Sequence, residues 1–285
     1  MKQVFLICAH KDMDQLNTLV AALVDPDFTI YVHLDRKSAL DPAALHPAAR
    51  HIAPRIDVRW GGWSQVEATL VSLRQILREQ PDFDKLVFLS AQDYPLLPNA
   101  LLKRALERLR AHELIETTRI APDGWNVGFR YQFFHREGGG RLERLGCALA
   151  NRVLRLTGRR RRMPDGFAAH GGSSWWALSR DCLVEALRLF DAHPRLARFM
   201  RTVQCPDEML FQTLVMHSRF AGRVLSDNFR YIQWPAQGAR NPKVLDAGDF
   251  ERIRASSAHF CRKLDSQVSA RLLPRLVEWK EGRAA

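Results

Sequence analysis

The sequence predicts an α/β protein with a central, mostly parallel sheet that is flanked by helices. Two observations predict this class. The first hundred residues alternate short apolar runs with amphipathic stretches that have the 3.6-residue period of a helix. Each apolar run is followed by polar residues, which is typical of strands that end at one edge of an open sheet.

The first strand is predicted at residues 4–9, which form a continuous apolar run. Leu16, Val20 and Leu23 then mark one face of a helix. Residues 29–34 are rich in β-branched and aromatic side chains and predict a second strand.

A short strand is predicted at residues 56–58, and a helix follows with one apolar stripe. The residues of that stripe are Val66, Leu70, Leu73 and Leu77. Residues 86–89 predict a further buried strand. On this assignment His10, Asp35 and Asp93 follow three strands at the ligand-binding edge of the sheet.

Residues 111–170 interrupt this pattern with three consecutive glycines at 138–140, a basic helix and a Pro164-Asp165-Gly166 turn. We therefore expect an insertion or lid within a single domain that spans residues 1–285. After it, the sequence predicts a strand at 174–178 and helices at 181–190, 195–200 and 207–216.

Composition favours a globular protein, because 285 residues with 46% hydrophobic content suffice for a sizeable core. No stretch approaches the roughly 18 apolar residues of a membrane span, and His10 and Lys11 interrupt the apolar N-terminus before a signal peptide could form. The five cysteines show no CxxC spacing, so we expect neither a disulfide framework nor a zinc site. These features predict a cytoplasmic protein.

The net charge of +12 is concentrated in residues 136–162, which contain nine arginines against Glu137 and Glu143. This segment is either a solvated helix and loop or a surface for an anionic membrane, where each basic residue adds about 1 kcal/mol. It contains no aromatic residue for base stacking, so nucleic acid is not expected as a partner.

Six segments together resemble the core-2/I-branching β-1,6-N-acetylglucosaminyltransferase family, which includes peptide O-xylosyltransferases. The resemblance covers nearly the whole chain outside 111–170, and the chain looks most similar to short bacterial members. The six segments are 30–38 (IYVHLDRKS), 60–66 (WGGWSQV), 89–96 (LSAQDYPL), 172–176 (GSSWW), 206–208 (PDE) and 260–265 (FCRKLD).

The resemblance implies a GT-A type glycosyltransferase fold, a UDP-sugar donor, inversion at the anomeric carbon, and no metal or other cofactor. It also assigns Glu208 as the catalytic base, and Arg240 and Lys263 as the cations that bind the diphosphate. The alternative for Glu208 is that it and Asp207 only stabilise a helix N-terminus. We expect Asp207 to serve the helix and Glu208 to face the cleft.

The absence of a DxD pair at the expected strand end is consistent with metal-free transfer, since Asp93 stands alone between Gln92 and Tyr94. Arginine and lysine can neutralise a diphosphate in place of a metal ion. The alternative for Arg240 and Lys263 is that each is an ordinary surface cation in a chain with 43 Lys and Arg.

The donor site is predicted to include five residues, and three of them also have a structural interpretation. Asp35 is either a uridine contact or part of a turn, His10 is either a ligand or structural, and Trp63 lines the pocket or packs in the core. The predicted donor-binding residues are His10, Asp35, Trp63, Ser64 and Asp93.

Acceptor binding is predicted for Trp175, Trp176 and Trp234, because a pyranose stacks its apolar face on an indole ring. Trp175 and Trp176 point to opposite faces of a strand, so one should enter the cleft and the other the core.

The sequence thus predicts an inverting, metal-independent enzyme that moves GlcNAc or a related sugar such as xylose from a UDP-sugar to a glycan or lipid-linked glycan hydroxyl. Two alternatives remain: an O-xylosyltransferase acting on protein serine, and a noncatalytic anion-binding or membrane-surface protein with the same fold. A cytoplasmic location with peripheral contact at the inner membrane face fits either enzyme.

Overall fold

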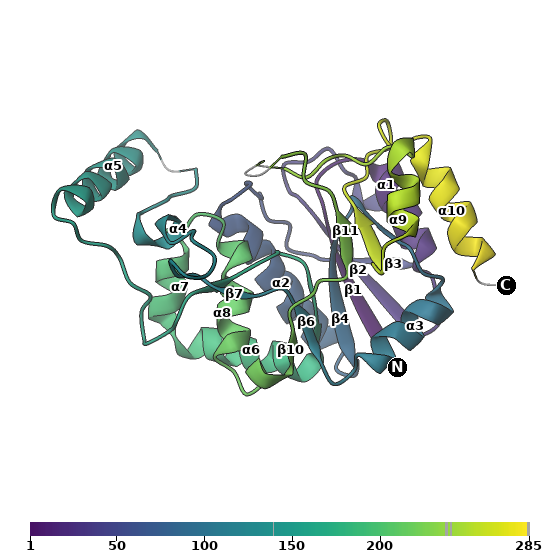
Figure 1. Cartoon of the computed structure of the whole chain (residues 1–285), viewed down its shortest axis with the longest axis horizontal. Coiled ribbons are helices and arrows are strands. Elements are labelled where there is room, and N and C mark those ends of the chain that lie inside the picture. The colour runs from purple at the N-terminus through teal and green to yellow at the C-terminus, as the bar shows by residue number, and fades with distance from the viewer. Residues whose placement is uncertain (139, 237–238, 240, 284–285) are drawn as a thin grey trace. The chain divides into compact units, whose positions relative to one another are not determined.

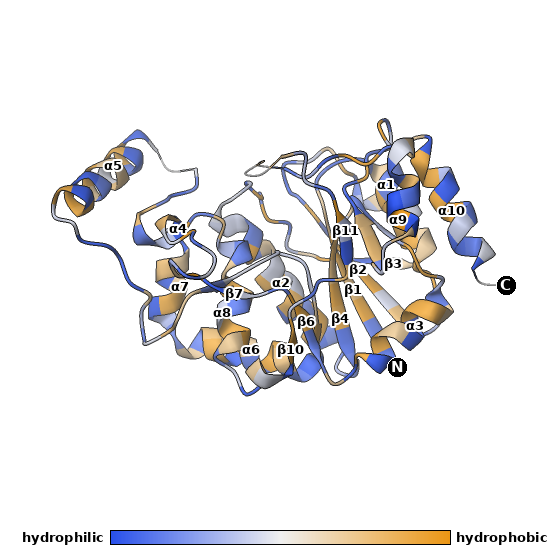
Figure 2. Ribbon diagram, in the orientation of Figure 1, coloured by the Kyte–Doolittle hydropathy of each residue, from blue (hydrophilic) through white to orange (hydrophobic). Residues whose placement is uncertain are grey.

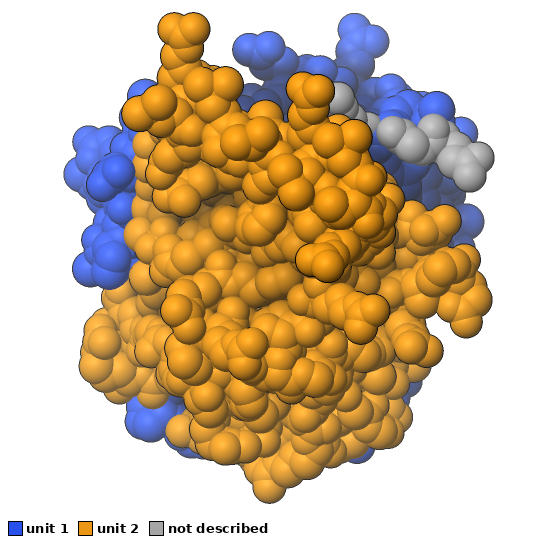
Figure 3. Space-filling view, turned by 90° about the vertical axis from the view of Figure 1, so that its left-hand side faces the viewer, with its two compact units in different colours: residues 1–55, 80–111, 228–285 blue, residues 56–79, 112–227 orange. Residues whose placement is uncertain are grey.

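The computed structural model describes residues 1–285 except 139, 237–238, 240 and 284–285. The chain divides into two compact units, which Figure 3 colours separately. Unit 1 comprises Met1–Arg55, Gln80–Ala111 and Asn228–Ala285, and unit 2 comprises Ile56–Glu79 and His112–Asp227. The single domain over 1–285 stays a prediction.

Unit 1 contains four parallel strands in the order β4-β1-β2-β3. Strand β1 (Gln3–Ala9) pairs with both β2 (Phe28–Leu34) and β4 (Lys85–Ser90), and these three are the predicted apolar runs. In the register, Val4 lies opposite Thr29 on one side and Leu86 on the other. The α/β class with parallel strands is therefore confirmed.

The predicted strand at 56–58 is wrong, because those residues have no regular structure. The edge strand is instead β3 (Ala49–His51), which pairs with β2 so that Ile30 lies opposite Ala49. Its pairing is made by the backbone at the border of the sheet, and its side chains are half-buried or exposed, so it has no apolar pattern.

A second, three-stranded sheet in unit 1 has the order β11-β12-β5. Its strands are Arg230–Ile232, Phe260–Arg262 and Asp93–Pro95, in that order. Buried apolar residues around it form a core cluster that includes Tyr94, Leu245 and Cys261. The helices of unit 1 are α1 (Met13–Ala22), α3 (Asn99–Arg108), α9 (Phe250–Arg254) and α10 (Leu272–Gly282), with 3-10 turns at Pro42–Ala44 and Ala247–Asp249.

Unit 2 contains strands in the order β10-β6-β9, a two-stranded β7-β8 ladder, and most of the longer helices. Its strands are β6 (Glu113–Ile115), β7 (Thr118–Arg119), β8 (His170–Gly171), β9 (Trp176–Ser179) and β10 (Val224–Leu225). Its helices are α2 (Trp63–Glu79), α4 (Phe129–Gln132), α5 (Arg141–Leu156), α6 (Arg180–Ala192), α7 (Pro194–Met200) and α8 (Leu210–Met216), with 3-10 turns at Pro206–Glu208 and Ala221–Arg223.

The segment 111–170, expected as an insertion, supplies a strand to unit 2. Strand β6 pairs antiparallel with β9, and Leu114 lies opposite Ala177. Glu113 in β6 is fully buried and accepts hydrogen bonds from the backbone N (2.7 Å) and the hydroxyl (2.6 Å) of Ser179. Ser179 is in turn the N-cap of α6, so β6 helps to fix where that helix begins.

The helix predicted at 207–216 begins later than expected. Cys205 has a left-handed backbone (φ 50°), and Pro206–Glu208 then forms a separate 3-10 turn. Helix α8 starts only at Leu210. The acidic pair therefore lies on a tight turn before the helix.

Helix α5 stands away from the other helices of unit 2 (Figure 1), and its ribbon alternates apolar and polar residues (Figure 2). Across the described part of the chain, no helix combines the length and apolar character needed to cross a membrane.

Candidate active site

Glu208 is held by an arginine from a distant part of unit 2. The Arg130 guanidinium forms a hydrogen-bonded ion pair with the Glu208 carboxylate, and the two side chains are 19% and 31% exposed. Arg130 also lies over the Trp125 ring, 4.8 Å from its centroid. The backbone N of Gly172 donates to the Glu208 carbonyl at 3.0 Å. Arg130 thus holds the carboxylate and Gly172 holds the backbone of the same residue, while part of the side chain stays open to solvent.

Asp207 has the more enclosed environment of the acidic pair. Its Oδ2 accepts hydrogen bonds from the Ser174 hydroxyl (2.7 Å) and from Gln65 (3.2 Å). Its Oδ1 is buried and has no hydrogen-bond partner among the described residues. Burial, and then the neighbouring Glu208 charge, raise the pKa of Asp207 to about 7. Asp207 does not cap a helix, contrary to the expectation for it.

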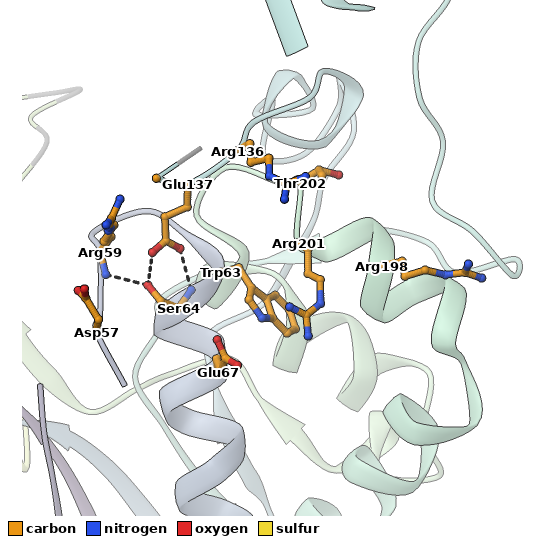
Figure 4. Close-up of a pocket in the computed structure, with 11 residues that line it drawn as sticks. Asp57, Arg59, Trp63, Ser64, Glu67, Arg136, Glu137, Arg198, Arg201 and Thr202 are labelled. Atoms are coloured by element: carbon orange, nitrogen blue, oxygen red, sulfur yellow. Dashed lines mark hydrogen bonds between the residues drawn. The ribbon is translucent and has the colours of Figure 1, made fainter. Parts of the chain in front are cut away.

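A pocket of about 480 Å³ lies in unit 2 next to the start of α2. Figure 4 shows Trp63 and Ser64 at its base, with Glu137 above Ser64 and Arg201 beside the indole. It is lined by Asp57, Arg59, Trp63, Ser64, Glu67, Arg136, Glu137, Gly138, Arg198, Arg201 and Thr202. Its four arginines against three carboxylates make it suited to a group with negative charge.

The two predicted donor residues in this pocket also have structural partners. The backbone N of Ser64 donates a hydrogen bond to the Glu137 carboxylate at 2.8 Å, and the Ser64 hydroxyl donates another to the same carboxylate. The hydroxyl also accepts a hydrogen bond from the Arg59 backbone N at 2.7 Å. Trp63 is 8% exposed and stacks on Phe190 with a centroid distance of 6.3 Å. The Arg201 guanidinium lies 4.8 Å from the Trp63 ring centroid. Trp63 therefore both packs in the core and borders the pocket.

The adjacent tryptophans Trp175 and Trp176 differ in burial, as the strand alternation predicts. Trp176 is 0% exposed and packs on Phe211 at a centroid distance of 5.2 Å. The prediction of Trp176 as an acceptor residue is therefore corrected: it is a core residue. Trp175 is half-buried and is the one of the pair that a ligand can reach.

Unit 1 contains a cluster of basic residues that includes His10, Lys11, Arg262 and Lys263. Packed atoms that exclude water lower the pKa of His10, and Lys263 and Lys11 lower it further. The pKa of Lys263 is lowered by burial and then by Arg262 and Lys11. Lys11 has a counter-ion in Asp265 at 2.6 Å, whereas no ion pair of Lys263 occurs among the described residues. Lys263 is therefore available to an anion.

Asp35 forms the turn that ends β2. Its side chain accepts from the Lys37 backbone at 3.1 Å, and its carbonyl accepts from the Ser38 hydroxyl (2.7 Å) and Arg55 (2.8 Å). With only 3% of its surface exposed, the residue acts mainly in this turn.

Asp93 is fully buried, which corrects the prediction that it reaches the donor directly. It opens β5, and its Oδ2 accepts from the Ser90 backbone at 2.8 Å. Its Oδ1 lies 3.6 Å from Arg262 Nε. The buried carboxylate thus supplies negative charge next to Arg262 and, through it, fixes the strand that leads to Lys263.

Of the other predicted site residues, Trp234 is 54% exposed on unit 1. Arg240, predicted to bind the diphosphate, lies outside the described residues. No group of three or more His, Cys, Asp or Glu side chains placed to hold a metal occurs in the part of the chain that the structure describes.

Sequence reasoning missed Arg130, Glu137 and Arg262. Arg130 lies 78 residues from Glu208, and Glu137 lies 73 residues from Ser64, so neither partner has a local pattern. Only Arg262 could have been found, because it stands directly before Lys263 in one of the segments with family resemblance.

The chain matches the family model described as "Branch: Core-2/I-Branching enzyme" over residues 4–254. Since this match covers most of the chain, the protein belongs to the Core-2/I-Branching enzyme family, a group of glycosyltransferases, as its motifs indicated.

Several curated proteins are similar in sequence. Xylosyltransferase 1 of Homo sapiens is 26% identical over 95% of this chain and 30% of its own length, and a xylosyltransferase of Ciona intestinalis is 24% identical over 95% and 33%. Beta-glucuronosyltransferase GlcAT14B of Arabidopsis thaliana is 26% identical over 88% of this chain and 60% of its own length. The chain spans about a third of the length of these xylosyltransferases.

Proposed function

We propose that this protein is an inverting, metal-independent glycosyltransferase of the GT-A type that transfers a sugar from a UDP-sugar to a hydroxyl of a glycan acceptor. Membership of the Core-2/I-Branching enzyme family supports the class of reaction. The relatives named as xylosyl- and glucuronosyltransferases make xylose and glucuronate candidates for the donor sugar beside GlcNAc.

The observation that carries the proposal is the environment of Glu208. Its carboxylate is partly exposed and held in place by Arg130, while the adjacent Asp207 is half-buried with one carboxyl oxygen fully enclosed, and its pKa is raised to about 7. A general base must reach the proton that it removes, so the partly exposed Glu208 suits this role and the enclosed Asp207 does not.

In the proposed reaction, Glu208 accepts the proton of the acceptor hydroxyl. The hydroxyl oxygen forms a bond to C1 of the sugar as the bond between C1 and the diphosphate oxygen breaks, and UDP leaves with that electron pair. Attack from the side opposite to UDP inverts the anomeric carbon. A well-placed base typically contributes a factor of about 10² to 10⁴ to such a step.

The leaving diphosphate requires positive charge, for which we propose Lys263 and Arg240. Lys263 supports this role because it has no ion pair among the described residues and lies near other cations that lower its pKa. A bound anion would offset the burial and the neighbouring cations that lower its pKa, so UDP and Lys263 should stabilise each other. His10 is proposed as a further contact to the UDP-sugar, because the Lys263 charge lowers its pKa and the two side chains are therefore close to each other.

Trp175 and Trp234 are proposed to contact the acceptor, because both have ring surface that a pyranose can stack on.

The proposal is tested by measuring UDP release from UDP-xylose, UDP-GlcNAc and UDP-glucuronate with EDTA present and glycan acceptors supplied. Glu208→Gln should lower kcat by about 10²-fold or more while UDP still raises the Tm of the variant, which shows that it is folded and binds the donor nucleotide. Glu185→Gln is the matched control. Glu185 also forms an ion pair with an arginine of unit 2, with 2.9 Å between its carboxylate and the Arg188 guanidinium, but it has no proposed role in the reaction. Full activity of Glu208→Gln would show that the base is another residue.

Donor binding is tested separately by the increase in Tm on addition of UDP, since a ligand that binds only the folded state stabilises it. Lys263→Met should weaken UDP binding about 10-fold, whereas Lys2→Met, at an exposed lysine paired with Asp82, should leave it unchanged. If UDP stabilises the protein but no sugar is transferred, the protein is a nucleotide-binding member without activity. Activity that EDTA abolishes would overturn metal independence.

A further inference from the structure

Helix α5 directs its apolar residues away from the protein. Five large apolar side chains recur on one stripe at the spacing of helix turns, and none of the five is buried. They are Leu142 (83% exposed), Leu145 (58%), Leu149 (65%), Val153 (50%) and Leu156 (77%). A surface helix normally packs such a stripe against the core, so this orientation is the reverse of the usual one.

The opposite side of the helix faces unit 2 and determines this orientation. The half-buried positions are Cys147, Ala150, Asn151 and Leu154, which share one face. Asn151 accepts a hydrogen bond from the Phe134 backbone N at 2.7 Å and donates one to the Phe134 carbonyl at 2.8 Å. These two bonds fix the rotation of α5, and they leave the leucine stripe on the outside.

The C-terminal end of α5 is anchored through Arg161. Its guanidinium donates to the carbonyls of Phe133 and Thr202 at 3.0 Å each, and it lies 4.1 Å from the ring centroids of Phe134 and Phe199. The exposed stripe therefore belongs to a helix that is attached at two points.

Arginines border the stripe along one side. At 100° per residue, Arg141, Arg144, Arg152 and Arg155 occupy the sector next to the leucines, and all four are exposed. Three more exposed arginines, Arg159, Arg160 and Arg162, are nearby in sequence. A leucine face bordered by arginines is typical of helices that lie in the interface of a membrane, with the apolar face among the acyl chains and the cations at the headgroups.

We propose that α5 binds this protein to the surface of a bilayer that contains anionic lipids, with the helix axis parallel to the membrane plane. The positive charge of the arginines beside the leucine stripe favours an anionic membrane as the partner. A second copy of the chain placed on the same stripe would bring one row of arginines close to another, which is unfavourable, whereas anionic headgroups neutralise them. This inference does not depend on the transferase activity proposed above.

The test is sedimentation of the full chain with vesicles of phosphatidylcholine alone or with 30% phosphatidylglycerol, at about 50 mM and 500 mM salt. Wild type should bind only the anionic vesicles, and more weakly at high salt. Leu145→Glu/Leu149→Glu should lower the partition coefficient at least about 10-fold. Val184→Glu/Val268→Glu is the matched control, since it changes charge equally at two other exposed apolar residues and should bind as wild type does.

The contribution of the cations is tested by Arg141→Gln/Arg144→Gln, which should weaken binding about 10-fold or more at low salt. The control is Arg78→Gln/Arg104→Gln, at exposed positions of α2 and α3. Light scattering of each variant reports the oligomeric state. Equal vesicle binding by the α5 variants and their controls would overturn the proposal. It would also be overturned if the wild type binds no vesicles and forms a dimer that Leu145→Glu/Leu149→Glu dissociates.

Discussion

Asp207 should make the protein less stable as the pH rises from about 4 to 7, which is the opposite of the usual effect of a carboxyl group. Its pKa is raised from an ordinary value near 4 to about 7, because the folded state buries it beside Glu208. A carboxyl group with a raised pKa binds its proton more tightly in the folded state. Its contribution to stability is therefore fully present below about pH 4 and is lost as the pH rises through 7.

The magnitude follows from linkage. One proton taken up on folding gives a slope of at most about 1.4 kcal/mol per pH unit, so the raised pKa corresponds to at most about 4 kcal/mol between pH 4 and 7. Asp207→Asn has no carboxyl proton but can still accept from Ser174. The variant should therefore gain stability relative to wild type as the pH rises, and should be the more stable protein at pH 8.

The assay is urea unfolding of wild type and Asp207→Asn at several pH values from 4.5 to 8.5. The difference in unfolding free energy between the two proteins isolates Asp207 and its interaction with Glu208, because groups farther away titrate equally in both. Asp123→Asn, at an exposed position, is the control and should give a difference that does not change with pH. A constant difference for Asp207→Asn as well would refute the argument that burial raises this pKa.

Three further predictions concern buried side chains. Glu113→Gln should lower the unfolding free energy by about 1–3 kcal/mol, because only one side-chain oxygen would remain to accept from the backbone N and the hydroxyl of Ser179; unchanged stability in urea would contradict this. Asp249→Asn should cost about 1–3 kcal/mol, because Asp249 is fully buried and accepts from Lys243 at 2.8 Å and from the Asp246 backbone at 2.9 Å. The pKa of Asp249 is lowered by these bonds despite its burial, so its contribution should disappear as the pH falls below about 4, which acid unfolding would measure. Trp176→Ala should cost about 3–5 kcal/mol and Trp175→Ala much less, and equal losses would show that the assignment of the two rings to core and surface is wrong.

The parts of the fold that the sequence predicted are those set by local patterns. The runs at 4–9 and 86–89 are apolar throughout and 29–34 is mostly apolar, because their strands are buried on both faces, and such strands are recognisable without tertiary information. Strand β3 was missed for the opposite reason, since Ala49–His51 lies at an edge where the backbone alone makes the pairing.

The sequence predicted those site residues that stand in a recognisable motif. It did not predict residues whose role depends on a side chain that is distant in sequence. Family resemblance singled out Glu208 and Lys263, but it could not supply Arg130, whose contact joins segments 78 residues apart. The same limit explains Asp207, which was assigned to the helix terminus because the sequence does not reveal Ser174 and Gln65 as its hydrogen-bond donors.

The glycines of the β7-β8 region restrict how this family member can change during evolution. A Cβ on Gly172 would lie 2.1 Å from the Glu116 carbonyl oxygen, and one on Gly171 would lie 3.0 Å from the carbonyl oxygen of Glu208. A larger residue at position 172 must push the Glu116 backbone aside, and one at position 171 crowds the Trp125 ring and the carbonyl of the proposed base. Libraries for engineering new specificity should therefore leave both glycines fixed.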